Sequence, residues 1–233
     1  LVPMEVINIL KVIFEEGFKY AILAFGVYLT YSILDFPDLS VDGTMPLGAI
    51  TSAVLILQGC NPWLSLLVAF AAGCVAGTIT GLLHVKLKIR PLLCGILVYT
   101  ACLSINLVLI KLGTGGQSIA SIFGKSTIFN TFPASLIPSA VGGVVINKLV
   151  LLFILVVIVK VVIDLYLQTK SGMLLRAPGS NEQYVKMLAK NPGVSKILGL
   201  ALGNGLAALS GAVIAQSNET ANTTMGTGMV VLG

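Results

Sequence analysis

Charged residues are scarce in this sequence: only 10% of its 233 residues are Asp, Glu, Lys or Arg, while 56% are hydrophobic. A soluble domain carries about 25% charged residues. The composition therefore excludes a soluble globular fold and predicts a polytopic membrane protein. The net charge of +5 is interpreted through loop placement, because Lys and Arg mark cytoplasmic loops. Nucleic acid is not an expected partner, since no basic cluster lies beside interleaved aromatic residues.

Metal-binding and reactive side chains are also few. The chain has one histidine, His84, and four cysteines. No two cysteines form a C-x-x-C pair, so we expect free thiols packed as small hydrophobic side chains. A metal site needs a cluster of ligands, and a catalytic centre needs a nucleophile beside a base. Because the sequence supplies neither pattern, we expect no metal, no cofactor and no enzymatic chemistry of its own.

Apolar segments of the length needed to cross a bilayer, about twenty residues, recur along the chain. We predict spans at residues 17–34, 63–84, 91–112, 149–167 and 197–215. Residues 4–19 place apolar side chains on one helical face and predict an interfacial helix before the first span. Gly73 and Gly77 form a G-x-x-x-G pattern that predicts close helix packing. The predicted fold is an all-α transmembrane helix bundle, one domain over residues 1–233.

The segment from Asp35 to Ile56 breaks this pattern. It contains three aspartates, Asp35, Asp38 and Asp42, followed by a Gly and a Pro. Its apolar part, residues 45–57, is too short to cross a bilayer, which needs about twenty residues. Carboxylates and broken backbone occur at membrane depth only where protein buries them or where they line a wet cavity. We therefore predict a half-length, re-entrant helix beside the translocation path.

Loop charge predicts the topology. Lys and Arg are concentrated in the N-terminal region and in the loops at 84–90 and 168–196. The positive-inside rule places all three in the cytoplasm. The N-terminus and the loop at 84–90 share one side only if the chain crosses an even number of times between them. The segment at 43–57 would then dip in from the outer side and return.

A weak internal repeat marks a second broken segment. Residues 42–48 align with residues 222–228, so that Thr, Met and Gly recur at an offset of 180. Paired Gly-interrupted segments point to a midplane site in transporters. The repeat predicts that further helices follow Gly233. The candidate residues of the re-entrant element and the translocation path are Asp38, Asp42, Gly43, Thr44, Met45, Thr224 and Met225. The aspartates have two open roles, capping the half-helix or contacting an amino group of the solute.

The polar loop at 170–196 has the form of a docking element. Its sequence from Arg176 runs R-A-P-G-S-N-E-Q-Y and continues through a short amphipathic stretch to N-P-G at residues 191–193. Pro178 and Gly179 predict a turn, Ser180 or Asn181 an N-cap, and the second Pro-Gly a stop. A short capped helix between two spans can dock on a soluble partner. An ordinary solvated loop is the alternative.

Two stretches resemble a known family. The R-A-x-G-x-N pattern with its short helix and N-P-G resembles the coupling loop of bacterial ATP-binding-cassette (ABC) importer permeases that serve branched-chain amino acids and ribose. The D-L-S-V-D-G stretch at residues 38–43 resembles the D-L-S-V-G element of the same permeases. The lead-in at residues 35–38 is most similar to the branch associated with tryptophan and tyrosine. One departure is Pro178, where the family often has other residues.

The resemblance implies a function and a set of partners. It implies a permease subunit in the bacterial inner membrane, with a cytoplasmic N-terminus, that moves a small solute, with an amino acid favoured. A second permease copy or a paralogue would complete a dimer, ATP-hydrolysing subunits would bind inside, and a solute-binding protein would deliver the solute outside. The implied coupling residues are Arg176, Ala177, Gly179, Asn181 and Tyr184.

One rival function remains open, that of a secondary transporter driven by an ion gradient. Lys160 and Asp164 are spaced i, i+4 in the span at 149–167. Each charge alone would cost about 2.5 to 3.5 kcal/mol at the centre of a membrane helix. The spacing therefore predicts a mutual ion pair near the cytoplasmic end, and an ion relay is the alternative.

Overall fold

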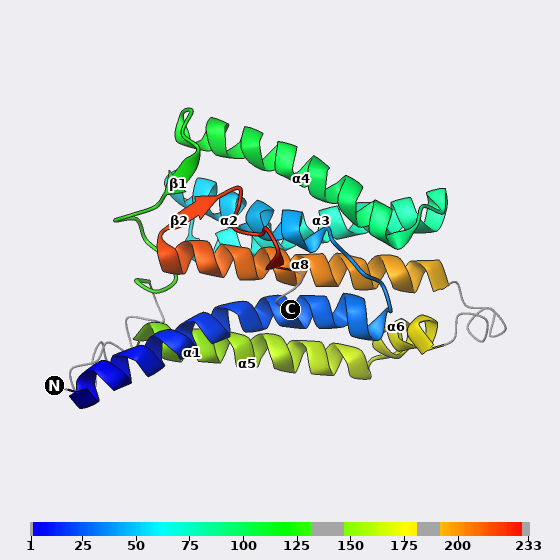
Figure 1. Ribbon diagram of the computed structural model, residues 1–233, viewed down its shortest axis with the longest axis horizontal. Helices are drawn as coiled ribbons and strands as arrows, with labels where there is room; N and C mark the ends of the chain where they lie inside the picture. The colour runs from blue at the N-terminus through cyan, green and yellow to red at the C-terminus, as the bar shows by residue number, and fades with distance from the viewer. Residues whose placement is uncertain (1, 132–146, 181–191, 230–233) are drawn as a thin grey trace.

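Long helices that run side by side form nearly the whole molecule (Figure 1). The computed structural model describes residues 2–131, 147–180 and 192–229. Within them, four helices are long and apolar enough to cross a membrane. These are α3 (Pro62–Leu87), α4 (Pro91–Thr114), α5 (Asn147–Gln168) and α8 (Pro192–Asn218). The prediction of an all-α polytopic membrane protein is confirmed.

The N-terminal part is one continuous helical element. Helix α1 (Val2–Val27) passes directly into the π-helix η1 (Tyr28–Ile33). The predicted interfacial helix at 4–19 is therefore not a separate helix, because no break divides it from the first span. Its apolar side chains between Val6 and Phe14 are exposed, as expected for a helix that enters a membrane at that level.

Helix α2 (Val41–Leu57) is the predicted half-length element, with 17 residues. Residues 34–40, called the linker below, connect it to η1 without forming a helix or a strand. Pro37 disfavours helical backbone at the residue before it, and Asp35 adopts a left-handed φ of 53°, which Asp tolerates better than most residues. These two residues end the first span well before α2 begins.

Helix α8 lies in the middle of the bundle (Figure 1), and small residues bring α2 and α3 against it. A Cβ atom on Gly48 would lie 2.0 Å from the carbonyl oxygen of Ala208, and one on Gly77 would lie 2.2 Å from that of Leu200. Gly73 faces Asn204 and Ala208 in the same way. The backbones are thus in direct contact, which confirms the close packing predicted from the G-x-x-x-G pattern.

The bundle has two distinct ends (Figure 1). At the basic end lie the connection from His84 to Arg90 and the short helix α6 (Lys170–Ser180). At the ribbon end, strand β1 (Ile119–Ser121) pairs antiparallel with β2 (Thr220–Asn222). The N-terminal end of α1 also lies at the ribbon end. The predicted topology, with the N-terminus on the same side as both basic loops, is therefore wrong.

The path of the broken segment explains this error. Helix α1 runs toward the basic end, because Lys19 hydrogen-bonds Asn218 whereas Leu34 packs on Gly199. Helix α2 runs the opposite way, from Thr44 beside Asn204 to Ser52 beside Gln216. The half-length helix is confirmed, but its return to the side it came from is wrong. An extended linker of seven residues reaches about 23 Å, so linker and α2 together complete a crossing.

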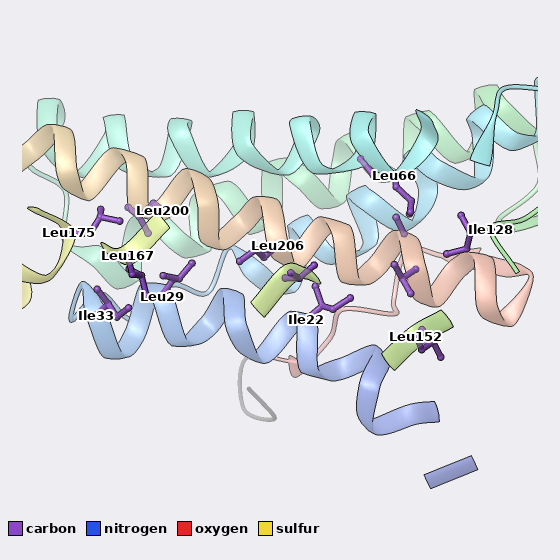
Figure 2. Close-up of a cluster of buried hydrophobic side chains, with 14 of the residues drawn as sticks. Ile22, Leu29, Ile33, Leu66, Ile128, Leu152, Leu167, Leu175, Leu200 and Leu206 are labelled. Atoms are coloured by element: carbon purple, nitrogen blue, oxygen red, sulfur yellow. The ribbon is translucent and has the colours of Figure 1, made fainter. Parts of the chain in front are cut away.

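A large apolar core joins α1, α5, α6 and α8 (Figure 2). Ile22 and Leu29 meet Leu152 from α5 and Leu206 from α8 in this cluster. In the apolar stretch that could cross the membrane, 72% of the residues of α8 are buried, but only 11% of those of α5. Helix α5 therefore lies at the perimeter, where most of its apolar side chains can face lipid.

Candidate functional site

A cluster of buried polar side chains occupies the place where α2 begins. Asp38, Ser40, Thr44, Thr80 and Asn204 form it, and we call it the Asn204 cluster. Asp38 is 4% exposed and the other four side chains are fully buried. The cluster joins the linker, α2, α3 and α8 near the middle of α8. Buried polar groups of this kind require hydrogen-bond partners, and here the partners come from one another.

Asn204 is the centre of the cluster. Its amide nitrogen donates to Asp38 Oδ2 at 2.7 Å and to the Leu200 carbonyl at 3.1 Å. Its amide oxygen accepts from the Ser40 hydroxyl at 3.0 Å and from the Thr44 hydroxyl at 2.8 Å. One side chain of α8 thereby holds three residues that precede or begin α2.

The Asp38 carboxylate also stabilises the linker locally. Its Oδ1 accepts hydrogen bonds from the Ser40 backbone N–H, at 2.9 Å, and from the Ser40 hydroxyl. This is the turn that an aspartate makes with the residue two positions later. Ser40 occupies the N-cap position of α2. The expectation that Asp42 caps this helix is therefore wrong, since Asp42 lies inside its first turn.

Helix α4 holds the opposite side of the same turn. The Asn106 amide nitrogen donates to the Gly43 carbonyl at 3.1 Å. A Cβ atom on Gly43 would lie 3.0 to 3.1 Å from Cys102 and Tyr99 of α4. Gly43 thus permits close approach, and the first turn of α2 is fixed from two sides by buried amides on α4 and α8.

The two segments of the weak repeat lie against each other. The Gly228 backbone N–H donates to Asp42 Oδ2 at 3.0 Å. Pro46 lacks the N–H that would bond the Asp42 carbonyl, and a Cβ atom on Gly226 would lie 2.1 Å from that carbonyl oxygen. Met45 is buried, and the half-buried Met225 packs against its hydrophobic cluster.

The backbone conformations of the two segments differ. Residues 42–48 are helical, whereas residues 223–228 form turns. Thr224 is exposed and hydrogen-bonds Asn222 Oδ1 through its backbone N–H and its hydroxyl. Of the path residues predicted from the repeat, the structure therefore brings Asp42, Met45 and Met225 together, and it leaves the Thr224 side chain outside this contact.

A cavity of about 430 Å³ lies beside the linker. Residues of η1, the linker and the first turn of α4 line it, including Tyr28, Tyr31, Asp38, Leu39 and Leu92. Pockets that hold small solutes have volumes of about 300–1,000 Å³. The cavity reaches the Asn204 cluster at Asp38, so the break in the bundle is next to open space.

A second buried polar cluster lies toward the ribbon end. Gln216 of α8 donates through Nε2 to the hydroxyls of Ser52 and Ser65, each at 3.0 Å, and it also contacts the Pro62 carbonyl. Its Oε1 accepts from the Ile128 backbone N–H at 3.0 Å. We call Ser52, Ser65 and Gln216 the Gln216 cluster. It joins α2, α3 and α8 where all three are regular helices.

Comparison with known families decides which class of protein has this arrangement. The family described as the branched-chain amino acid transport system permease component matches residues 10–233. The chain belongs to this family. It is thus an ABC importer permease, a transport component, and the family predicted from the two sequence stretches is confirmed.

Individual relatives of this permease have names for different solutes. A tyrosine transport system permease protein of Clostridioides difficile is 41% identical over 95% of this chain and 69% of its own length. A probable branched-chain amino acid transport permease protein of Methanocaldococcus jannaschii is 29% identical over 88% and 66%. A fructose import permease protein of Bifidobacterium longum is 27% identical over 84% and 52%. No solved structure gave a significant match.

The residues of the predicted coupling loop are only partly described. Arg176 is exposed on α6 at the basic end of the permease. Ala177 and Gly179 also belong to α6, which extends to Ser180. The turn predicted at Pro178 and Gly179 is therefore wrong, because the helix continues through both residues. Asn181 and Tyr184 lie outside the described residues.

The predicted ion pair in α5 is confirmed. Lys160 Nζ lies 2.6 Å from Asp164 Oδ2, and both side chains are more than half exposed. The pair lies on the perimeter helix rather than among the buried groups around the linker.

Sequence reasoning missed Asn204, Ser40, Thr80 and Gln216. The available signal was a single Asn inside the apolar span at 197–215, since a polar side chain at membrane depth marks a functional or packing site. The partners of Asn204 are Asp38, Ser40 and Thr44, which lie 160 to 166 positions earlier in the chain. Local spacing therefore had no means of pairing them.

Proposed function

We propose that this permease moves an amino acid inward across a bacterial cytoplasmic membrane, powered by ATP-hydrolysing partner subunits. The observation that carries the proposal is the break between η1 and α2, which places buried polar groups inside the bundle and a cavity beside them. A helix that only anchors a protein in the membrane needs no such break. Broken helices at membrane depth are typical of transport paths.

The favoured solute is an amino acid, and tyrosine is the first to test. Support comes from the tyrosine transport system permease, which is 41% identical to this chain. The exposed Tyr28 and Tyr31 side chains at the cavity fit a solute with an aromatic or apolar side chain, since aromatic rings pack favourably against one another.

The basic end faces the cytoplasm in this proposal. The lysines and arginines at that end, among the described residues, are Lys86, Lys88, Arg90, Lys170, Arg176 and Lys196. The positive-inside rule places such loops inside. The ATP-hydrolysing subunits then bind the segment at 170–196, and the binding protein meets the ribbon end. The N-terminal end of α1 lies outside, which replaces the cytoplasmic N-terminus expected from sequence.

The full assembly contains two permeases and two kinds of partner. We propose a second copy or a paralogue across a membrane interface, so that each chain contributes one helix bundle as a single domain over residues 1–233. Alternating access follows if ATP binding favours one arrangement of the two permeases over the other, because a ligand shifts an equilibrium only through differential affinity for its states.

Reconstituted uptake tests the function. The purified complex of permease, ATP-hydrolysing subunits and binding protein is placed in proteoliposomes, and uptake of labelled tyrosine is measured with and without ATP. We expect uptake only when ATP and the binding protein are both present. Uptake that persists without ATP, and that follows an ion gradient instead, would contradict the proposal and favour a secondary transporter.

Cysteine labelling tests the orientation. Phe123 at the ribbon end is 83% exposed and Leu87 at the basic end is 64% exposed. With cysteine at either position and Cys60 replaced by Ser, a membrane-impermeant thiol reagent added to whole cells should label position 123 and not position 87. The reverse pattern would show that the basic end faces outward.

A further inference from the structure

Asn204 of α8 hydrogen-bonds the linker through its side chain, at Asp38 and at Ser40. The linker has few backbone hydrogen bonds, such as Phe36 N–H to the Thr30 carbonyl at 3.0 Å. The Asn204 amide ties the far end of the linker, Asp38 to Ser40, to α8, and the Thr80 hydroxyl of α3 adds a longer hydrogen bond to Ser40 at 3.4 Å. A helix such as α8 moves as a rigid unit. The extended linker has no such rigidity, so it moves with the helix to which it is hydrogen-bonded.

Helix α8 connects that amide to the basic end. It begins at Pro192, within the segment 170–196 proposed to bind the ATP-hydrolysing subunits, and it continues without interruption through Asn204. Twelve helical residues span about 18 Å. A shift of the α8 N-terminus therefore reaches Asn204 through one unbroken helix.

We propose that Asn204 is a positioning residue for transport, which makes the linker and the first turn of α2 follow α8 when the ATP-hydrolysing subunits move its N-terminus. The inference rests on the proposed function, because it needs a coupled ATP-driven complex. The segment that moves in this proposal runs from Asp38 to Thr44, and its residues Asp38 and Leu39 line the cavity. Asn204 touches no solute in this account.

Hydrogen-bond chemistry explains why an amide suits this position. The Asn204 side chain donates to the Asp38 carboxylate and accepts from the Thr44 hydroxyl, and its oxygen shares the one Ser40 hydroxyl proton with Asp38. A carboxylate at 204 could accept from the hydroxyls, but it would face the Asp38 carboxylate as a like charge. An amide at 38 would remove that repulsion and restore a carboxylate–amide hydrogen bond with the two roles exchanged.

The test is a second-site rescue in the intact complex. The N204D variant and the D38N/N204D double variant are reconstituted with ATP-hydrolysing subunits and binding protein, and tyrosine uptake is divided by ATP hydrolysed. We expect the ratio to fall about tenfold in N204D, the loss that corresponds to one charge-assisted hydrogen bond. In the double variant it should recover to within about threefold of wild type, since the hydrogen bond is regenerated.

The matched control is Gln216→Glu, which also places a carboxylate in a buried amide position of α8. Its partners, Ser52 and Ser65, lie on continuous helices, so uptake per ATP should stay near the wild-type value. An equal fall in Q216E, no fall in N204D, or no recovery in the double variant would each overturn the proposal. A wild-type complex without ATP-driven uptake would instead overturn the proposed function.

A milder variant serves if N204D does not assemble. Thr44→Val keeps the shape of the side chain and removes the hydroxyl, which bonds Asn204 Oδ1 at 2.8 Å and, less closely, the Val41 carbonyl at 3.3 Å. We expect uptake per ATP to fall about threefold, the loss of part of one neutral hydrogen bond, with assembly unchanged. An unaltered ratio in a fully assembled T44V complex would overturn the proposal.

Discussion

The Asn204 and Gln216 clusters have the same chemistry in two different places. Each is centred on one buried amide of α8 that binds hydroxyls from α2. The Gln216 cluster is neutral and joins continuous helices, whereas the Asn204 cluster contains a carboxylate and holds the broken connection to α2. We therefore expect the Gln216 amide to serve packing, and the amide beside the break is the better candidate for a role in transport.

Both clusters require α2 and α8 to lie close together. A substitution that forces these helices apart should therefore cause the largest loss of stability. Gly48 lies between Thr44 and Ser52, and a Cβ atom there would meet the Ala208 backbone at 2.0 Å. We expect Gly48→Ala to destabilise the permease by about 3 kcal/mol through overpacking. Thermal unfolding in detergent measures this. The matched control is Gly17→Ala on α1, where no atom lies within 4 Å, and an equal loss there would contradict the account.

Removing the central amide should lower the free energy of unfolding by different amounts in the two clusters. Asn204→Leu leaves the Asp38 carboxylate without its amide donor, and we expect a loss of about 2 kcal/mol, as for hydrogen bonds to charged groups. Gln216→Leu removes only neutral hydrogen bonds, and its expected cost is about 1 kcal/mol. Unfolding of both variants under one condition gives the difference. A larger loss in Q216L would reverse the ranking of the two clusters.

The segment proposed to bind the ATP-hydrolysing subunits should affect transport without affecting stability. Arg176 is exposed on α6, which contributes no residue to either cluster. We expect Arg176→Ala, and likewise substitution of Gly179, to lower uptake per ATP about tenfold, a loss of about 1.4 kcal/mol in coupling. Unfolding should match wild type. Normal uptake in these variants would show that energy enters the permease elsewhere.

The exposed ion pair of α5 should have the smallest effect. Lys160 and Asp164 pair with each other on the perimeter helix, outside both clusters, and replacing both residues removes the pair without leaving a lone charge. The double variant K160Q/D164N should retain uptake and nearly full stability. A complete loss of uptake in that variant would indicate that the pair, rather than the Asn204 cluster, carries the coupling, as a secondary transporter requires.

Much of the fold followed from apolar length and small-residue spacing. The spans at 63–84 and 91–112 are helices, Gly73 and Gly77 face α8, and the segment after Met45 is a half-length helix. These features depend on local composition, because a bilayer requires a minimum helix length and close helices require small residues. A single sequence carries such information directly.

The path of the broken segment did not follow from the sequence. Charge counting treated residues 35–57 as a segment that either crosses as a helix or returns, and it omitted an extended linker joined to a half-helix. The site was also incomplete, because Asp38 and Thr44 were identified without their partner Asn204. That partnership depends on helix packing between distant segments, which spacing within a segment does not encode.

The most direct test compares the two carboxylate substitutions in α8. Tyrosine uptake per ATP hydrolysed is measured for wild type, N204D and Q216E complexes in one vesicle preparation. The account predicts a fall of about tenfold for N204D, where a hydrogen bond to a charge is lost, and a near wild-type ratio for Q216E. Equal ratios in all three complexes would contradict it.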